Sequence, residues 1–481
     1  MTSLAHPLTS RLHASANLDT NERGRRRFVQ IVAIVYWLLI FEGVLRKWVF
    51  PGQGRLLFFI RDPFVILAYL LAFSYRMRPI SSLFLVLAMM IAVFAVPIVL
   101  LQYSAERAQF SWLLAAYGYR NYFLYVPLAF FVARYFGRQD IMVLMRRTLL
   151  LSIPIAVLVY VQVLSPGTAP INQGLGKNPD EIYINGGVTE QVVRTYGTFT
   201  SSPGQGAFVT SSVAMVLSIW LLPAARRPLR GVALIAATGA VMSCAGLSGS
   251  RGALIACGLV VCAAMVAALM VAGRALAVRV IAVPILLVLL GIAVMPVIFP
   301  VALDALATRW KGAGESETGY YGRGGVLARA LSDLTTFASL LPVTPPQGFQ
   351  MGIGGNAGSN LGAQEERMPL STDEEWGALE SDWGRNIVEL GPIPGMLFIA
   401  FRIALTFWMG RNALAATRRS GDPLPLVLFG YVGVLMASGQ ITGHGTLNGY
   451  AWLFAGFCMA LSRESGSEHQ YGSSRNRISF W

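Results

Sequence analysis

The chain has 481 residues, of which 55% are hydrophobic and only 13% are charged. This composition is more apolar than a soluble globular domain requires, so it argues against a soluble enzyme. The net charge of +14 would suggest nucleic-acid binding in a soluble protein. Here the arginines flank apolar segments, so we interpret them as a topology signal and expect no nucleic-acid partner. All four cysteines lie inside apolar segments, which predicts neither a metal site nor a disulfide framework.

Twelve apolar segments are long enough to cross a lipid bilayer as helices. Every second loop between them carries an arginine cluster, which is the positive-inside pattern and predicts cytoplasmic termini. No cleavable signal peptide is visible before the first segment. The predicted spans are 28–48, 57–75, 80–102, 110–133, 143–163, 204–223, 230–247, 252–273, 278–302, 386–409, 424–441 and 446–462, and the clusters lie within 23–27, 76–78, 134–147, 226–230, 274–279, 411–419 and 463–477.

The loops and tails divide the chain into five parts. We expect polar, disordered cytoplasmic tails, a bundle of nine spans, a large outer loop and a bundle of three spans. Within the large loop, a stretch rich in proline and glycine between residues 345 and 355 predicts a mobile loop. It lacks the Gly-Lys-Ser/Thr ending of a phosphate-binding loop, although a mobile loop can still close over a substrate. The five parts are 1–27, 28–302, 303–385, 386–463 and 464–481.

A few charged residues interrupt the predicted spans. Arg120 lies in the middle of the fourth span, where a lone charge costs at least about 2.5–3.5 kcal/mol. Arg61 and Asp62 are adjacent in the second span, and Glu42 lies in the outer half of the first. One interpretation is an internal ion-pair network, such as Glu42 with Arg46 and Arg120 with a nearby acid. The other is a polar cavity that opens outward and binds an anion.

Three further segments lie at the outer ends of predicted spans. They are residues 194–204, the turn 248–252 and residues 380–395. Each is compatible with an ordinary cap, turn or helix start; Ser250, for example, could cap the following helix, whose free amide groups would then favour an anion. Taken together, they place arginines and carboxylates on one face of the membrane.

That combination suits a glycan carried on a lipid pyrophosphate. Arginine guanidinium groups match phosphate oxygens well, and a carboxylate can deprotonate a sugar hydroxyl. No metal or other cofactor is required if arginines neutralise the leaving group. The candidate pyrophosphate ligands are Arg194, Arg251, Arg120, Arg385 and Ser250, and the candidate bases, among which the sequence does not choose, are Glu380, Asp382 and Glu389.

At these residues the chain resembles the O-antigen ligase and polymerase superfamily of bacterial membrane glycosyltransferases. An Arg-x-x-Gly-x-Phe segment matches Arg194–Phe199, and a Ser-Arg-Gly turn matches Ser250–Gly252. A loop-to-helix signature, Glu-x-Gly with a further glycine, matches Glu389–Gly395. The segment Glu42–Trp48 also resembles exopolysaccharide members of the group. Each motif is short, and their order and location carry the resemblance.

The resemblance implies an all-helical membrane bundle of the membrane glycosyltransferase type in the bacterial inner membrane. Its active site would face the periplasm. The donor would be an undecaprenyl-pyrophosphate-linked glycan, transferred with inversion to a growing glycan or to a lipid core. Polysaccharide assembly proteins are possible further partners.

One departure from the family bears on the activity. Ligases usually carry a histidine nine residues before the signature glutamate, and this chain has Glu380 there. The only other outer histidine, His444, is better explained by packing in a turn. These residues favour a polymerase over a ligase.

Three other functions remain open. A transporter or flippase also fits twelve spans, but major facilitator proteins carry their longest central loop inside, and no paired broken helices are visible here. A glycosyltransferase that uses a lipid-phosphate sugar would need an acidic first outer loop, and residues 49–56 contain no acid. A structural role in assembly is also compatible with the sequence.

Overall fold

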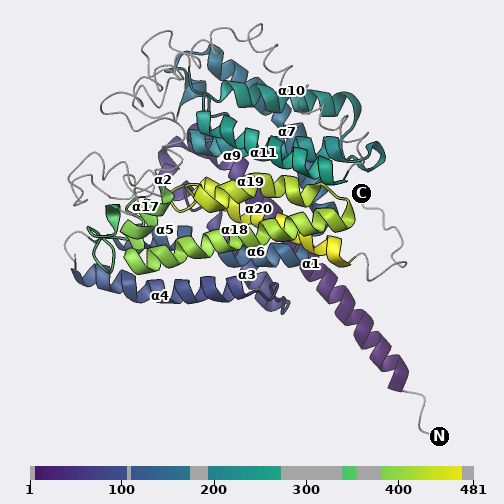
Figure 1. Cartoon of the computed structure of the whole chain (residues 1–481), viewed down its shortest axis with the longest axis horizontal. Helices are drawn as coiled ribbons and strands as arrows, with labels where there is room; N and C mark the ends of the chain where they lie inside the picture. The colour runs from purple at the N-terminus through teal and green to yellow at the C-terminus, as the bar shows by residue number, and fades with distance from the viewer. Residues whose placement is uncertain (1–5, 106–109, 174–192, 272–338, 355–380, 468–481) are drawn as a thin grey trace.

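The structure is a computed structural model, and it describes residues 6–105, 110–173, 193–271, 339–354 and 381–467. Within these ranges the protein is a bundle of helices, which confirms the predicted all-helical fold class (Figure 1). The helices are α1 (His6–Val44), α2 (Gly54–Leu57), α3 (Asp62–Ser74), α4 (Leu83–Ala105), α5 (Trp112–Phe123), α6 (Val126–Tyr135), α7 (Arg138–Leu164), α9 (Ser202–Leu221), α10 (Gly231–Leu247), α11 (Arg251–Val271), α17 (Asp382–Leu390), α18 (Pro392–Ser420), α19 (Leu424–Ser438) and α20 (Gly445–Ser467).

Six of the described helices are long and apolar enough to cross a membrane. They support the prediction of a membrane protein. Eleven of the twelve predicted segments overlap described helices, and the ninth, 278–302, lies outside the described residues. The six candidate spans are Asn21–Val49, Leu83–Ala105, Arg138–Leu164, Ser202–Leu221, Arg251–Val271 and Pro392–Ser420.

Two predicted spans are broken in the structure. The segment 110–133 forms α5 and α6, because Pro127 at the start of α6 has no N–H to continue the helical hydrogen bonds. The segment 386–409 begins earlier than predicted, as α17, and is interrupted at Gly391, whose φ of 87° only glycine adopts readily. Helix α17 therefore starts three residues before the predicted end of the large loop at residue 385.

Most of the N-terminal segment that was predicted to be a disordered tail is helical in the structure. Helix α1 begins at His6 and projects from the bundle before entering it (Figure 1). Pro7 suits the first turn of a helix, and no further proline or glycine follows until Gly24. At its other end, α1 passes into one π-helical turn, Leu45–Val49.

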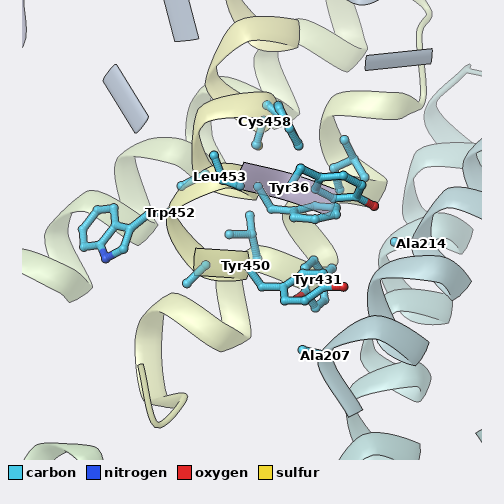
Figure 2. Packing of buried hydrophobic residues seen from close by; sticks show 14 of the residues in the cluster. Tyr36, Ala207, Ala214, Tyr431, Tyr450, Trp452, Leu453 and Cys458 are labelled. Atoms are coloured by element: carbon cyan, nitrogen blue, oxygen red, sulfur yellow. The ribbon is translucent and has the colours of Figure 1, made fainter. Parts of the chain in front are cut away.

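Helix α20 lies in the middle of the bundle. Its Tyr450, Trp452 and Leu453 are fully buried. Tyr36 of α1 and Tyr431 of α19 lie beside Tyr450 (Figure 2), and the ring centroids of Tyr36 and Tyr450 are 6.4 Å apart. Because α20 is enclosed on every side, its first residues are held rigidly at the end of the bundle where the candidate site lies.

Ion pairs and hydrogen bonds connect the arginine-rich ends of the helices to one another. Arg25 pairs with Asp140 at 2.9 Å, and Arg138 pairs with Asp422 at 2.9 Å. Arg463 donates to the carbonyl of Arg134 at 2.7 Å. The basic segments 23–27, 134–147 and 411–419 and the start of the last one, at Arg463, therefore gather at one end of the bundle. The described candidate site residues belong to the opposite end.

Candidate functional site

All the buried charged side chains of the described residues lie at the end of the bundle opposite the arginine-rich loops. We call this group the charged end. It holds five cations and four carboxylates, so cations are in excess. The cations are Lys47, Arg61, Arg120, Arg385 and Arg402, and the carboxylates are Glu42, Asp62, Asp382 and Glu389.

Three arginines converge on the turn that precedes α20. Arg61 donates to the carbonyl of Gly445 at 2.8 Å. A Cβ on Gly445 would lie 3.0 Å from nitrogens of both Arg61 and Arg120. A Cβ on Gly443 would overlap the guanidinium of Arg385. A larger residue at either position would have to displace a guanidinium group, because these groups lie directly on the backbone here.

The charged groups inside the predicted spans form the internal ion-pair network that one interpretation anticipated. Arg120 binds both oxygens of Asp62 at 2.7–3.0 Å. Glu42 pairs with Arg46 at 3.3 Å and with Arg61 at 2.8 Å. Adjacent residues at the start of α3 thus pair in opposite directions, Arg61 with α1 and Asp62 with α5. Arg120 lies near the end of α5, and not in the middle of a continuous span.

Asp382 is occupied by donors on both oxygens. Its Oδ1 accepts from the backbone and hydroxyl of Thr442 at 3.1 and 2.7 Å and from Arg385 at 3.1 Å. Its Oδ2 accepts from Arg402, whose remaining donors bind the carbonyls of Met436 and Gly439. Since the carboxylate is also completely buried, its geometry suits anchoring α17 to α18 and to the turn before α20.

Glu389, one turn after Arg385 on α17, is placed differently. Its Oε1 accepts from the backbone of Gly354 at 2.9 Å, and no hydrogen bond of normal geometry reaches its buried Oε2. Burial raises the pKa of this carboxyl from its ordinary value to about 7, against the opposing effect of Arg385. The amide of Gly352 and the hydroxyl of Tyr122 also lie near enough to the carboxyl to lower its pKa slightly. A half-ionised carboxyl with one free oxygen is suited to accept a proton near neutral pH. The third candidate base, Glu380, lies outside the described residues.

Residues 339–354 pack closely against this carboxyl, contrary to the mobile loop predicted for 345–355. Gln102 at the end of α4 donates to the carbonyls of Gln347 and Glu389, both at 2.7 Å. A Cβ on Gly118 of α5 would lie only 2.4 Å from the backbone nitrogen of Gly352. The glycines here permit close packing, and do not mark a free loop in residues 345–354.

His444 in the same turn is buried, as its predicted packing role requires. Its Nε2 lies 3.0 Å from the Gln440 side-chain oxygen. Burial, assisted by the charge of Arg385, lowers its pKa to about 3, so His444 is neutral at physiological pH.

The Arg194 segment lies on the other side of α1. Lys47 donates to the carbonyl of Gly197 at 2.6 Å, and a Cβ on Gly43 would overlap the carbonyl of Thr198. Thr195 donates to the carbonyl of Leu247 at 3.1 Å, which holds this segment next to the turn containing Ser250. The motif segments around Arg194 and Arg251 are therefore neighbours in the structure.

Ser250 caps α11, as the sequence predicted. Its hydroxyl accepts from the backbone of Ala253 at 3.3 Å, and α11 begins at Arg251. The structure thus brings the described candidates together in two neighbouring groups at the charged end. One contains Arg120, Asp382, Arg385 and Glu389; the other contains Arg194, Ser250 and Arg251. In α1, Glu42 pairs with Arg61 of the charged end, and Gly43 lies against Thr198 in the segment that contains Arg194.

Sequence reasoning missed two members of the charged end. Arg402 is a lone arginine in an apolar helix, so the argument that singled out Arg120 applied equally to it. Lys47 was noticed only as part of the segment Glu42–Trp48. No protein-family profile, curated protein or solved structure matches this chain.

Proposed function

We propose that this protein is a membrane polysaccharide polymerase. It would transfer a glycan from undecaprenyl pyrophosphate to the hydroxyl of a growing surface polysaccharide, at the periplasmic face of a bacterial inner membrane. The observation that carries the proposal is the charged end itself. Five buried cations face four carboxylates, and Glu389 is only partly ionised at neutral pH. The remaining positive charge favours a diphosphate.

The proposed reaction is a single displacement at the anomeric carbon of the donor. The acceptor oxygen forms a new bond to that carbon while the bond from the carbon to the phosphate oxygen breaks. Glu389 takes the proton of the acceptor hydroxyl, and undecaprenyl pyrophosphate leaves with the bonding electrons. The arginines stabilise the negative charge that develops on the leaving oxygen. Attack opposite the leaving group inverts the configuration.

The choice of Glu389 rests on its free oxygen. Asp382 already accepts from four donors, so an acceptor hydroxyl would have to displace one of them. Glu380 replaces the histidine of the ligases in the sequence and stays an alternative base. Of these three carboxylates, Glu389 is therefore tested first by the variant Glu389→Gln. The variant Glu380→Gln is measured in the same assay.

The test uses a strain that lacks the gene, complemented with the wild type, Glu389→Gln or Glu22→Gln. Glu22 pairs with Arg25 and Arg26 at the opposite end of the bundle, so its variant controls for loss of a carboxylate as such. Lipid-linked glycans and surface polysaccharide are then separated by length, with protein levels measured in the membrane fraction.

A polymerase predicts that Glu389→Gln accumulates single repeat units on the carrier lipid while long chains disappear. Glu22→Gln should restore the normal profile. Long chains that remain on the carrier and fail to reach their acceptor would instead identify a ligase. Lipid-linked material trapped on the cytoplasmic face would identify a flippase or transporter. An unchanged profile in the deletion strain would reject the enzyme proposal altogether.

A further inference from the structure

Lys47 differs from the other four buried cations of the charged end. Arg61 and Arg120 each bind their own carboxylate, and Arg385 and Arg402 share Asp382. Lys47 forms no ion pair with a carboxylate of the described residues. Its side chain is 3% exposed, and its ammonium donates to the carbonyl of Gly197 at 2.6 Å.

The local backbone directs this ammonium inward. Lys47 lies in the π-helical turn Leu45–Val49, and such turns occur often at functional sites. Arg46, the preceding residue, points elsewhere and stacks on Phe58 with 3.7 Å between its Cζ and the ring centroid. Two consecutive basic residues therefore serve different surroundings, and only Lys47 reaches the segment that contains Arg194.

The groups around Lys47 include polar atoms without hydrogen-bond partners. Gln205, in the first turns of α9, is 1% exposed, and neither atom of its amide is hydrogen-bonded. It faces the same turn as Lys47, because a Cβ on Gly197 would lie 2.7 Å from its Oε1. The buried hydroxyl of Thr198 also has no partner. The side chain of Ser201 does not cap the N-terminus of α9, a helix of 20 residues.

These groups together suit an anion. The buried ammonium meets one carbonyl oxygen and the ring of Trp48, whose centroid lies 4.4 Å away, but no carboxylate of the described residues. Much of its desolvation cost therefore remains, and a bound anion would offset that cost. The N-terminus of α9 adds free amide groups and the positive end of the helix dipole. The amide and hydroxyl can each donate to a phosphate oxygen.

We propose that Lys47, Gln205, Thr198 and the N-terminus of α9 form a subsite for a phosphate group of a prenyl diphosphate. The proposal rests on the proposed function in identifying this ligand as the glycan donor. It goes further in placing the diphosphate on the α9 side of α1. Adjacent residues of α1 face different groups here, since Gly43 lies against Thr198 of the subsite while Glu42 pairs with Arg61.

Binding of undecaprenyl pyrophosphate to the purified full-length protein in nanodiscs tests the subsite without requiring turnover. Lys47→Gln is the decisive variant, because it keeps N–H donors on a side chain that is one atom shorter but carries no charge. We expect Lys47→Gln and Lys47→Met to weaken binding by at least about tenfold, as expected for loss of a charge-assisted hydrogen bond. Lys47→Arg should recover most of the affinity.

Trp48→Phe is the matched control. It removes the hydrogen bond from Trp48 to the carbonyl of Pro170 at 3.2 Å in the same turn. It keeps an aromatic ring beside the Lys47 ammonium, which lies 4.4 Å from the centroid of the Trp48 ring. Its affinity should equal that of the wild type. Thermal unfolding of each variant without ligand identifies any that fail to fold. Normal affinity in a folded Lys47→Gln protein would overturn the proposal, because Lys47 would then only hold the turn.

Competition identifies the ligand chemistry. Inorganic pyrophosphate should displace the prenyl diphosphate from the wild type. In Lys47→Gln, where binding of the prenyl diphosphate is already weakened, pyrophosphate should cause no further decrease. Displacement by phosphatidylglycerol and not by pyrophosphate would indicate a lipid head-group site and overturn the proposal. The catalytic proposal can fail while the subsite proposal stands. If binding depends on Lys47 but Glu389→Gln retains full transfer activity, the subsite is supported and Glu389 is rejected as the base.

Discussion

Replacing Asp382 by asparagine should be among the most destabilising single changes in the bundle. The completely buried carboxylate accepts from Arg402, from Arg385 and twice from Thr442. Asparagine removes the charge and turns an acceptor into a donor facing these donors. The guanidinium of Arg402 would keep only the carbonyls of Met436 and Gly439. Breaking a buried ion pair from one side costs about 3–5 kcal/mol, so we expect a loss of that size in the free energy of unfolding.

A matched ion pair at the opposite end supplies the control. Arg138 and Asp422 also lie 2.9 Å apart, but their side chains are 33% and 17% exposed. Asp422→Asn should therefore cost only about 0–1 kcal/mol. In the double variant Asp382→Asn/Arg402→Met, Arg402 is no longer left without its carboxylate and only Arg385 loses its ion pair. The cost should therefore be smaller than the sum of the two single costs by about 0.5–3 kcal/mol.

Equilibrium unfolding in mixed detergent micelles, followed by tryptophan fluorescence, measures all four variants under one set of conditions. Similar costs for Asp382→Asn and Asp422→Asn, or strict additivity in the double variant, would refute the reasoning. Either result would mean that water reaches Asp382 or that its donors find other partners.

Two further predictions concern packing and pH. Gly118→Ala should destabilise the protein by more than about 1 kcal/mol, because its Cβ would meet the backbone of Gly352 at 2.4 Å. Gly239→Ala in α10 has open space around its Cβ and should be neutral or stabilising. Equilibrium unfolding of both variants checks this prediction. The folded-state pKa of Glu389, about 7, exceeds its ordinary value of 4.5, so the folded protein retains a proton that the unfolded chain has lost. This contribution to stability is complete below pH 4.5 and is lost as the pH rises through 7, so the wild type should lose on the order of 3 kcal/mol relative to Glu389→Gln between pH 4.5 and 8. Parallel pH-stability curves would contradict this assignment.

The membrane character and the gathering of basic loops at one end could be predicted because both depend on short-range patterns. An apolar segment of sufficient length and an arginine beside it are visible without knowledge of the fold. The pairing of Arg120 with an acid was also predictable, because a lone buried charge needs a partner. Its identity, Asp62, depends on the packing of α3 against α5.

The local geometry around Glu389 could not be predicted, because it depends on contacts between distant segments. Gln102 of α4 holds the carbonyls of Gln347 and Glu389 together, and Gly352 packs on Gly118. In the sequence, the proline and glycine of that loop indicate only flexibility. Lys47 illustrates a second limit, since a single π-helical turn decides which of two adjacent basic residues points inward.

Arg61 pairs with Glu42, which precedes it in the chain, whereas Asp62 pairs with Arg120, which follows it. This difference has a consequence for how the chain enters the membrane during synthesis. Glu42 is made before Arg61, so the arginine finds its counter-ion already in place. Asp62 must wait for Arg120, which follows after α4. A nascent chain that ends between these two residues would carry one uncompensated carboxylate, so α3 and α5 gain from being released into the lipid together. The spacing of charges thus sets an order of assembly as well as a final structure.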